Sequence, residues 1–315
     1  MQNTGKQYND LNTYYRSLFG CRVHKITIDA GFSCPNRDGT LSRSGCIYCN
    51  ANGSGTGFFK KGLSISQQLY QGKQMLFKRY KAKKYIAYFQ SFSNTYAPVD
   101  RLKQVYDEAL SVEDVIGLSI GTRPDCVDAS VLNLLQSYTK DHLVWIEYGL
   151  QSAHDQTLSL INRGHSFDCF EKAVHATKNR GIKTCVHIIL GLPNENKRLM
   201  LETAKRIASL GIDGIKIHLL YVIKGTKLED LYLSGSYICL EQEDYAQLVC
   251  DFLELLPKNM IIHRLTGDPH PEELVAPLWS MKKKETLALI NKTMKERDSW
   301  QGKFMLNHAP ESIQL

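Results

Sequence analysis

Residues 29–49 read DAGFSCPNRDGTLSRSGCIYC, a loop of many small and polar residues that holds Cys34, Cys46 and Cys49 in a C-x11-C-x2-C spacing. The last two cysteines, set on a turn, can direct two thiolates at one metal centre, and a flexible loop can bring in the third. Three protein thiolates leave one position open on a four-site centre, which suits catalysis rather than a closed structural site. We therefore predict an iron–sulfur cluster with one open iron. A zinc ion with a distant fourth ligand and three unliganded buried thiols are the alternatives.

Short runs rich in β-branched and apolar residues alternate with helical patterns around this loop. The predicted strands are Val23–Ile28, Tyr85–Phe89, Val115–Ile120, Val144–Tyr148, Cys185–Leu190, Ile215–Val222 and, as a seventh candidate, Met260–Leu265. The predicted helices are 64–80, 129–138, 167–180, 197–210 and, with the clearest apolar stripe, 241–256. Strands that alternate with helices predict βαβ units and a parallel sheet, in a barrel or a doubly wound fold.

The ends of the predicted strands share a feature, because each runs into a polar or Gly-containing loop. In parallel α/β barrels the carboxyl ends of the strands carry the chemistry. The connection after the first strand, residues 29–84, is longer than one helix needs, so its first half is expected to be functional or irregular. We predict that these loops form one functional rim that includes the cysteine loop.

The composition indicates a folded protein of a reducing compartment. Apolar residues make up 43% and charged residues 23%, with 16 Tyr and 11 Phe, which excludes disorder as the main state. Neither a run of ~18 apolar residues nor a hydrophobic leader stands out, so we expect a cytoplasmic protein with no membrane partner. Nine cysteines, an odd number, fit a disulfide framework badly. The net charge of +7 permits a polyanionic partner without requiring one.

The cysteine loop, with Tyr48 as the aromatic residue between its last two cysteines, resembles the radical S-adenosylmethionine (SAM) superfamily. The common spacing there is C-x3-C-x2-C. The longer first gap of this chain is a feature of the elongator-catalytic-subunit-like branch, to whose YhcC/YtqA-type members the sequence is similar. The resemblance covers roughly residues 10–280. Further segments that carry it are YFQSFSNTY (88–96), SIGTRPD (119–125), EYGLQS (147–152), INRGH (161–165) and LGLPNE (190–195). The acetyltransferase domain of the elongator subunit is not carried over, because nothing after Leu256 is long enough to form one.

The resemblance implies an α/β fold, a partial (βα)6 TIM-like barrel with a C-terminal extension, that holds a [4Fe–4S] cluster and SAM. We expect an N-terminal segment at 1–20, the barrel at 21–256 with the cluster loop at 30–62, and the extension at 257–315. The three cysteines of the loop would bind the cluster, with Tyr48 beside the cofactors. SAM would bind the open iron through its amino and carboxylate groups. Such an enzyme also implies a reductant such as flavodoxin or ferredoxin.

SAM would be held beside the cysteine loop by residues at several strand ends. Ser93, Asn94 and Thr95 stand where the family offers polar groups to the SAM amine, although the usual Glu is absent. The same run is also a good helix-entry turn. Arg123 and Arg163 are candidates for the SAM carboxylate, because a guanidinium binds a carboxylate bidentately. The alternative for each arginine is a structural or solvated charge.

Glu147 lies in a predicted strand whose alternation puts it on one face with Trp145. A carboxylate inside a barrel is costly unless it is paired, so Glu147 would bind the ribose hydroxyls of SAM or pair with an arginine. Gln151, just beyond it, can serve the same ligand. Gly191 and Leu192 resemble the strand end that contacts adenine in this family, with a plain turn as the alternative.

The branch resemblance implies an enzyme that modifies tRNA at a wobble uridine, in the step that converts a carboxymethylaminomethyl group toward aminomethyl. Basic and aromatic residues near the rim would then contact phosphates and bases. The candidates are Arg37, Arg43, Lys60, Lys61, Lys282–Lys284, Phe58 and Phe59. Two alternatives are a small-molecule radical SAM oxidoreductase and a non-catalytic zinc-bound RNA-binding module. Iron content separates the zinc module from the enzymes.

Overall fold

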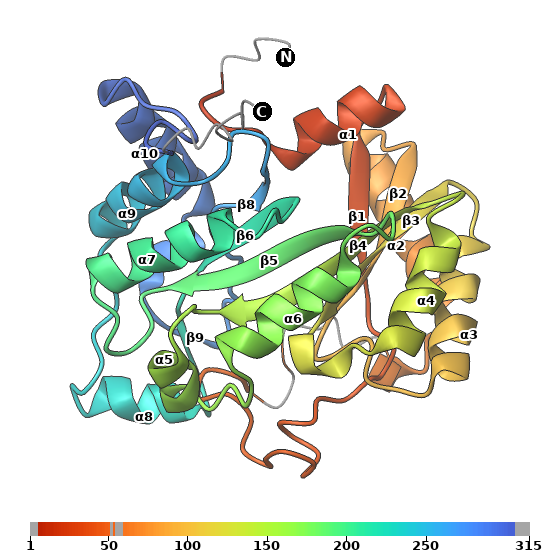
Figure 1. The fold of residues 1–315 in the computed structure, drawn as a ribbon, viewed down its shortest axis with the longest axis horizontal. Coiled ribbons are helices and arrows are strands. Elements are labelled where there is room, and N and C mark those ends of the chain that lie inside the picture. Colours follow the sequence, from red (N-terminus) through yellow and green to blue (C-terminus); the bar gives the residue numbers. More distant parts are fainter. Residues whose placement is uncertain (1–5, 51–52, 54–58, 306–315) are drawn as a thin grey trace, which may run out of the picture.

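The computed structural model describes residues 6–50, 53 and 59–305, without the side chain of Lys60. Its centre is a sheet of seven parallel strands in the order β1-β2-β3-β4-β5-β6-β8, curled into a half-barrel (Figure 1). The strands are β1 Val23–Ile28, β2 Lys84–Phe89, β3 Val115–Thr122, β4 Leu143–Gln151, β5 Lys183–Leu190, β6 Gly214–Leu219 and β8 Ile261–Arg264. The expected partial barrel is confirmed, and the seventh candidate strand takes part in it.

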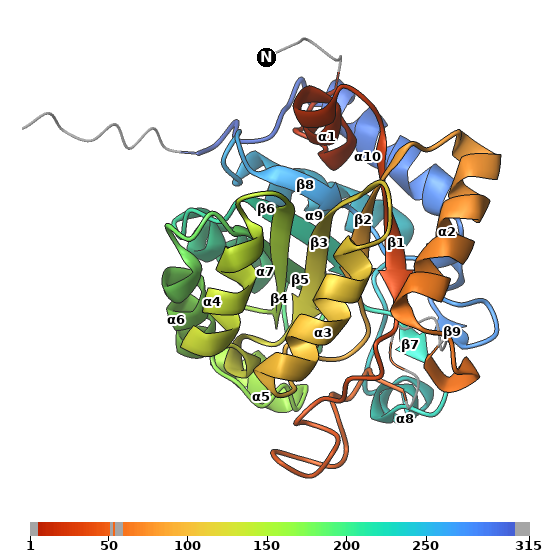
Figure 2. The same cartoon turned by 90° about the vertical axis from the view of Figure 1, so that its right-hand side faces the viewer.

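Most of the helices connect successive strands and cover the outer face of the sheet (Figures 1 and 2). They are α1 Leu11–Phe19, α2 Ile65–Tyr80, α3 Val99–Leu110, α4 Ala129–Tyr138, α5 Asp155–Leu160, α6 Phe167–Thr177, α7 Lys197–Ala208, α8 Lys227–Leu233, α9 Gln242–Glu254 and α10 Lys283–Glu296, with short 3-10 turns η1 Phe59–Lys61, η2 Pro124–Cys126 and η3 Leu278–Met281. α2 follows the cysteine loop and begins at a capping box between Ser64 and Gln67. The apolar stripe predicted at 241–256 is buried on α9.

Alternation along the strands sends side chains to two different environments. On β4, Val144, Ile146 and Tyr148 pack in the main core beneath the helices. Trp145 and Glu147 point the other way, into the barrel, where both are fully buried. The predicted face of these two residues is therefore confirmed.

The end of the barrel at the amino termini of the strands is closed by α1. Tyr14 of this helix packs edge-on against Trp145, with ring centroids 6.1 Å apart. Leu11 joins the same apolar cluster, which also contains Cys185 and Ile261. The cysteine loop lies at the opposite end, where the carboxyl ends of the strands meet (Figure 2). Ligands therefore reach the barrel interior from the rim that carries the cysteine loop.

The predicted strand 215–222 is wrong as a single element. β6 ends at Leu219, and β7 Val222–Ile223 leaves the barrel to pair antiparallel with β9 Leu274–Ala276. This break is hard to predict from the sequence, because Val222 is an apolar residue that is buried like those of β6. It is buried, however, in a second apolar cluster that includes Leu228 of α8.

The expected domain boundaries at residues 20 and 256 stay predictions. β8, beyond the second boundary, completes the main sheet, and α10 packs against α9. Parts of the expected N-terminal segment, cluster loop and C-terminal extension lie outside the described residues, namely 1–5, 51–52, 54–58 and 306–315. Within the described ranges, none of the helices has the length and apolar character that a membrane crossing requires.

Candidate active site

The cysteine loop leaves β1 and folds as a series of turns at the open end of the barrel. The main-chain N–H of Cys49 donates to the carbonyl of Cys46 at 3.0 Å, which closes the C-x-x-C segment into a turn. Between them, the N–H of Ile47 donates to the carbonyl of Ile161 at 3.1 Å and anchors this turn after α5. Cys34, Cys46 and Cys49 together line one pocket.

Charged and amide donors surround two of the three sulfurs. Arg163 Nη1 and Asn36 Nδ2 each lie 3.7 Å from Cys46 Sγ, and Arg37 Nη1 lies 3.5 Å from Cys49 Sγ. Burial raises the pKa of the Cys49 thiol, whereas the charge of Arg37 favours its thiolate. Burial would lower the pKa of Arg163, but the negative charge of the nearby Cys46 thiolate raises it above its ordinary value. These donors favour thiolates, the form of cysteine that binds metals.

The spread of the three sulfurs fits a cluster better than a single ion. A tetrahedral zinc with Zn–S bonds of about 2.3 Å holds its sulfurs about 3.8 Å apart. In the part of the chain that the structure describes, the cysteines of the loop do not form a group with all ligand atoms within 4.8 Å of one another. Asn36 Oδ1, Tyr48 Oη and Ser93 Oγ are buried beside the same pocket without a hydrogen-bond partner among the described residues. The pocket therefore suits an iron–sulfur cluster with a polar ligand next to it.

Both candidate arginines are buried at this pocket, and each has protein partners. Arg123 holds Asp125 with Nε and Nη2 at 2.9 and 2.7 Å, and its Nη1 donates to the carbonyl of Arg163 at 2.7 Å. Arg163 donates from Nε and Nη2 to the carbonyl of Gly149 at 3.2 and 2.6 Å. Its Nη1 stays next to the Cys46 sulfur, so Arg163 is the better placed of the two for a ligand at the cluster. A contact with the SAM carboxylate stays a prediction for both.

Of the three residues expected to meet the SAM amine, Ser93 lies at the pocket. Its buried hydroxyl has no hydrogen-bond partner among the described residues. Asn94 donates to the carbonyl of Gly121 at 2.9 Å, and Thr95 donates to that of Cys126 at 2.6 Å. Asn94 and Thr95 thus hold the loops after β2 and β3 together, while Ser93 offers an acceptor to a ligand.

Glu147, expected to bind ribose or pair with an arginine, pairs with two lysines. Lys25 Nζ lies 2.5 Å from Oε1, and Lys216 Nζ contacts Oε2. Oε1 also accepts from Ser119, and Oε2 accepts from His187 Nε2 at 2.7 Å. Burial alone would raise the pKa of Glu147, but Lys216 and Lys25 hold it well below its ordinary value. Glu147 serves a charged network inside the barrel, and a ribose hydroxyl would have to displace one of these donors.

Sequence reasoning missed Lys25 and Lys216, although a signal was present. Each stands inside a predicted strand at a position that alternation assigns to the barrel interior, where a charge must be paired. Burial lowers the pKa of Lys25 to about 8 and that of His187 to about 4. His187 is therefore neutral at pH 7 and donates from Nε2 to the ionised Glu147.

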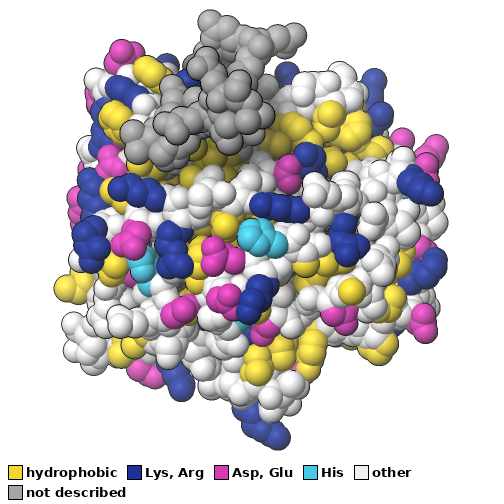
Figure 3. All heavy atoms as spheres, viewed as in Figure 1, with side chains coloured by type: hydrophobic (Ala, Val, Ile, Leu, Met, Phe, Trp, Pro, Cys, Tyr) yellow, Lys and Arg dark blue, Asp and Glu magenta, His cyan; other side chains and the backbone are white. Residues whose placement is uncertain are grey.

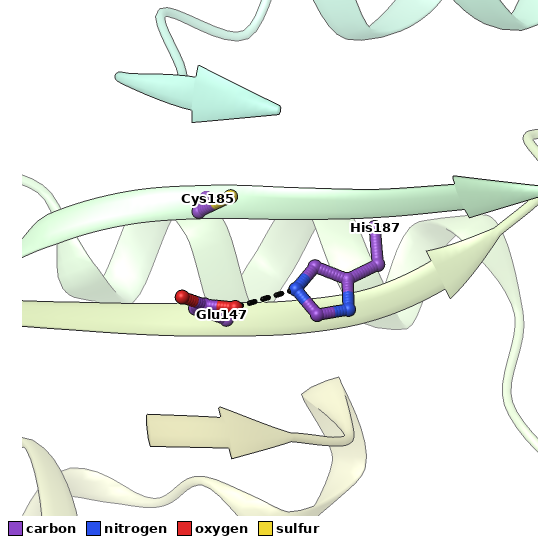
Figure 4. Close-up of side chains that lie close together, drawn as sticks. All are labelled: Glu147, Cys185 and His187. Carbon is purple, nitrogen blue, oxygen red and sulfur yellow. Dashed lines mark hydrogen bonds and ion pairs between the residues drawn. The ribbon is translucent and has the colours of Figure 1, made fainter. Parts of the chain in front are cut away.

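Glu147 of β4 and Cys185 and His187 of β5 form a compact group inside the barrel (Figure 4). Their ligand atoms all lie within 4.8 Å of one another, which is close enough for one metal ion. The Glu147 carboxylate, however, already accepts from four donors, two of which are the ammonium groups of Lys25 and Lys216. A metal ion there would meet both lysine charges, so we interpret the group as a hydrogen-bonded network.

The remaining cofactor candidates divide between the pocket and the second apolar cluster. Tyr48 and Gln151 line the pocket. A Cβ on Gly149 would come within 2.8 Å of Gln151 Nε2, so a glycine is needed there for Gln151 to take this place. Leu192 is buried in the second apolar cluster, and the carbonyl of Gly191 accepts a tyrosine hydroxyl at 2.8 Å. Their contact with adenine stays a prediction.

Comparisons with known proteins point to one family. The family model described as the Radical SAM superfamily matches residues 34–207, and the Radical_SAM C-terminal domain matches residues 212–296. The chain is 45% identical to the uncharacterized protein YtqA of Bacillus subtilis, over 98% of this chain and 96% of that protein. It is 41% identical to the protein YhcC of Escherichia coli, over 83% of this chain and 84% of that protein. The solved structure of the archaeal Methanocaldococcus infernus Elp3 matches with a TM-score of 0.68 at 17% identity. The match covers 89% of this chain and 64% of that chain, and it shows that the two proteins share a fold.

Proposed function

The chain belongs to the radical SAM superfamily as a YtqA/YhcC-type protein related to Elp3, and from this premise we propose that it modifies a tRNA wobble uridine. The proposed step converts a carboxymethylaminomethyl group toward aminomethyl. The family uses a [4Fe–4S] cluster and SAM, which when bound supply hydrogen-atom abstraction from the substrate. Radical SAM enzymes need a reductant, for which we propose flavodoxin or ferredoxin.

One observation carries the cofactor assignment: three cysteines of one loop line a pocket whose arginines lie next to two of the sulfurs. Cys34, Cys46 and Cys49 would bind three irons and leave the fourth for SAM. Arg163, whose guanidinium lies next to Cys46, and Ser93, whose buried hydroxyl has no hydrogen-bond partner among the described residues, would hold the charged end of SAM.

The tRNA assignment is supported by the resemblance to the elongator branch and by the position of the rim. A wobble uridine lies in a single-stranded loop, so its base can be presented to a pocket without breaking a duplex. Arg43 in the cysteine loop and Lys61 in η1 are exposed near this rim and could contact phosphates. Phe58 and the side chain of Lys60 lie outside the described residues.

Two further basic candidates contact other side chains of the protein. Arg37 is half-buried against Cys49, and Lys283 pairs with Asp268 at 2.6 Å. The face drawn in Figure 3 mixes lysine and arginine side chains with acidic ones, so the net charge of +7 is not gathered there. For RNA contacts the proposal therefore relies on the loop residues rather than on the overall charge.

The test compares tRNA nucleosides by mass spectrometry from a wild-type and a deletion strain, and then from tRNA treated with purified protein. We expect the carboxymethylaminomethyl nucleoside to accumulate in the deletion strain and to be consumed by the reconstituted protein with SAM and a reductant. Cys46→Ala should abolish this consumption, whereas Cys169→Ala, on α6, should not. An unchanged nucleoside profile together with cluster-dependent SAM cleavage would favour a small-molecule substrate. Zinc in place of iron, together with tRNA binding and without SAM cleavage, would favour the RNA-binding module.

A further inference from the structure

We propose that a charged layer inside the barrel, formed by Lys25, Glu147 and Lys216, is a subsite for the carboxylate of the substrate's carboxymethylamino group. The inference rests on the proposed function, which supplies a substrate with such a group. It adds to that function the residues that would distinguish the acid substrate from its amine product.

The charged layer lies between the pocket and the apolar cluster around Trp145, against which Leu11 and Tyr14 of α1 pack. Lys25 comes from β1, Glu147 from β4 and Lys216 from β6, so side chains from distant strands of the curled sheet meet inside the barrel. Trp145, two residues before Glu147, packs against α1 and closes the layer on that side. On the other side, the pocket lined by the cysteines reaches Glu147 and His187. An extended substrate group that enters past the cysteine loop would therefore end at this layer.

A count of hydrogen bonds shows unused donors in the layer. The Glu147 carboxylate receives four donors, two on each oxygen, which fills its acceptor sites. Lys25 donates one hydrogen bond to Glu147 and one to Ser119. Lys216 donates one to Glu147 and one to the Tyr88 hydroxyl. An ammonium group has three N–H donors. Each lysine therefore has one N–H without an oxygen or nitrogen acceptor among the described residues, although the centre of the Tyr88 ring lies 4.0 Å from Lys216 Nζ and 5.1 Å from Lys25 Nζ.

A count of charges gives the layer one surplus positive charge, because two ammonium groups face one carboxylate. Among the other titratable groups around it, Arg264 is charged and pairs with Asp268 at 3.5 Å, and the remaining groups are neutral at pH 7. Burial lowers the pKa values of three of them, His187, His218 and His263, and raises those of two, Cys185 and Tyr88. A buried charge without a counter-charge is costly. An incoming carboxylate would neutralise the layer.

The pocket reaches the layer at Glu147 and His187. Lys25 and His187 keep 15% and 17% of their side chains accessible, although Glu147 is fully buried. His263 gives a second, independent sign of a ligand position. It is fully buried at 4.0 Å from Glu147 Oε1, and neither of its ring nitrogens has a hydrogen-bond partner among the described residues. A neutral imidazole there can donate to a bound carboxylate.

The test uses two probes that differ by one carboxylate, N-benzylglycine and N-benzylmethylamine, on anaerobically reconstituted protein with SAM. Calorimetry at pH 7 gives the two dissociation constants. We expect the acid to bind at least about tenfold tighter than the amine, the effect of charge-assisted hydrogen bonds to both lysines. Lys25→Met and Lys216→Met should each bring this ratio toward one. The control Lys183→Met, which removes a half-exposed lysine paired with Asp213 at the amino end of β5, should leave it unchanged.

A second variant covers the case in which the lysine variants fail to fold. In Glu147→Gln the acid probe would take the place of the lost carboxylate, so we expect it to bind at least about tenfold tighter than to the wild type. It should also raise the melting temperature of this variant, whereas the amine should not. A layer closed to ligands would show no such rescue. Equal or absent binding of the two probes to the wild type, or no rescue of Glu147→Gln, would overturn the subsite.

Failure of the proposed function would give a different pattern. If wild-type protein converts the tRNA and Lys216→Met does so with the same KM, the subsite is wrong and the tRNA function stands. If the protein binds the acid probe selectively but leaves the tRNA unchanged, the anion subsite stands and the tRNA assignment is wrong.

Discussion

Replacing Glu147 by Gln should destabilise the protein by an amount that depends on pH. The substitution keeps the shape of the side chain and removes the charge that Lys25 and Lys216 share. Both lysines then lie in the barrel interior without a counter-charge. Removing one partner of a buried ion pair costs about 3–5 kcal/mol. We expect a loss of this size in the free energy of unfolding at pH 7.

This loss should shrink as the pH rises. With Glu147 present, burial lowers the pKa of Lys25 from 10.5 to about 8. Without Glu147, the pKa values of Lys25 and Lys216 should fall further. Between its folded and unfolded pKa values, each lysine binds more protons in the unfolded state, so stability rises with pH by up to about 1.4 kcal/mol per unit. Between pH 7 and pH 8 the wild-type Lys25 loses its proton only gradually and reaches about half protonation at pH 8, so the gap between the two proteins should narrow by about 1–2.5 kcal/mol over this range.

Chemical denaturation between pH 7 and pH 8 measures this gap. Asp213→Asn is the control, because Asp213 pairs at 2.7 Å with Lys183, whose side chain is 42% exposed. An exposed ammonium group keeps its proton over this range, so the gap between Asp213→Asn and the wild type should not change with pH. A Glu147→Gln variant as stable as the wild type at pH 7, or a gap that widens with pH, would refute the view that Glu147 balances two charged lysines.

Three further outcomes test the site. Cys46→Ala should abolish iron binding and SAM cleavage, measured by anaerobic iron analysis and product chromatography, while Cys169→Ala keeps both; stoichiometric zinc in active protein would contradict the cluster. Arg163→Ala should weaken SAM binding about tenfold or more in calorimetry, because it removes a charged donor next to Cys46; unchanged affinity would make Arg163 a purely structural residue. The double variant Arg43→Ala, Lys61→Ala should lower tRNA affinity. A plot of the logarithm of the binding constant against the logarithm of the salt concentration should become flatter by about 0.7 per lost phosphate contact, while SAM cleavage in the absence of RNA stays unchanged. An unaltered slope would exclude these residues from the RNA surface.

Local signals in the sequence located most of the fold. Seven predicted strands carry β-branched or apolar runs, and each lies at least partly in a strand of the main sheet. Where the prediction failed, the local signal was misleading or overlooked. From Leu219 to Val222 the run stays apolar and aromatic, so nothing in it marks the point where the chain leaves the barrel after Leu219. α3 was overlooked, although Leu102, Val105, Tyr106 and Ala109 stand at helical spacing and are buried.

The sequence by itself determined the cysteine loop and the faces of the strands. C-x-x-C closes a turn between neighbouring residues, and alternation decides that Trp145 and Glu147 point into the barrel, because both effects depend only on nearby residues. The partners of Glu147 were decided by the tertiary structure alone. Lys25 lies 122 residues and Lys216 69 residues away in the chain. Alternation states which way a side chain points, but the curl of the sheet and the register of its strands determine which side chain it meets, and no local pattern contains either.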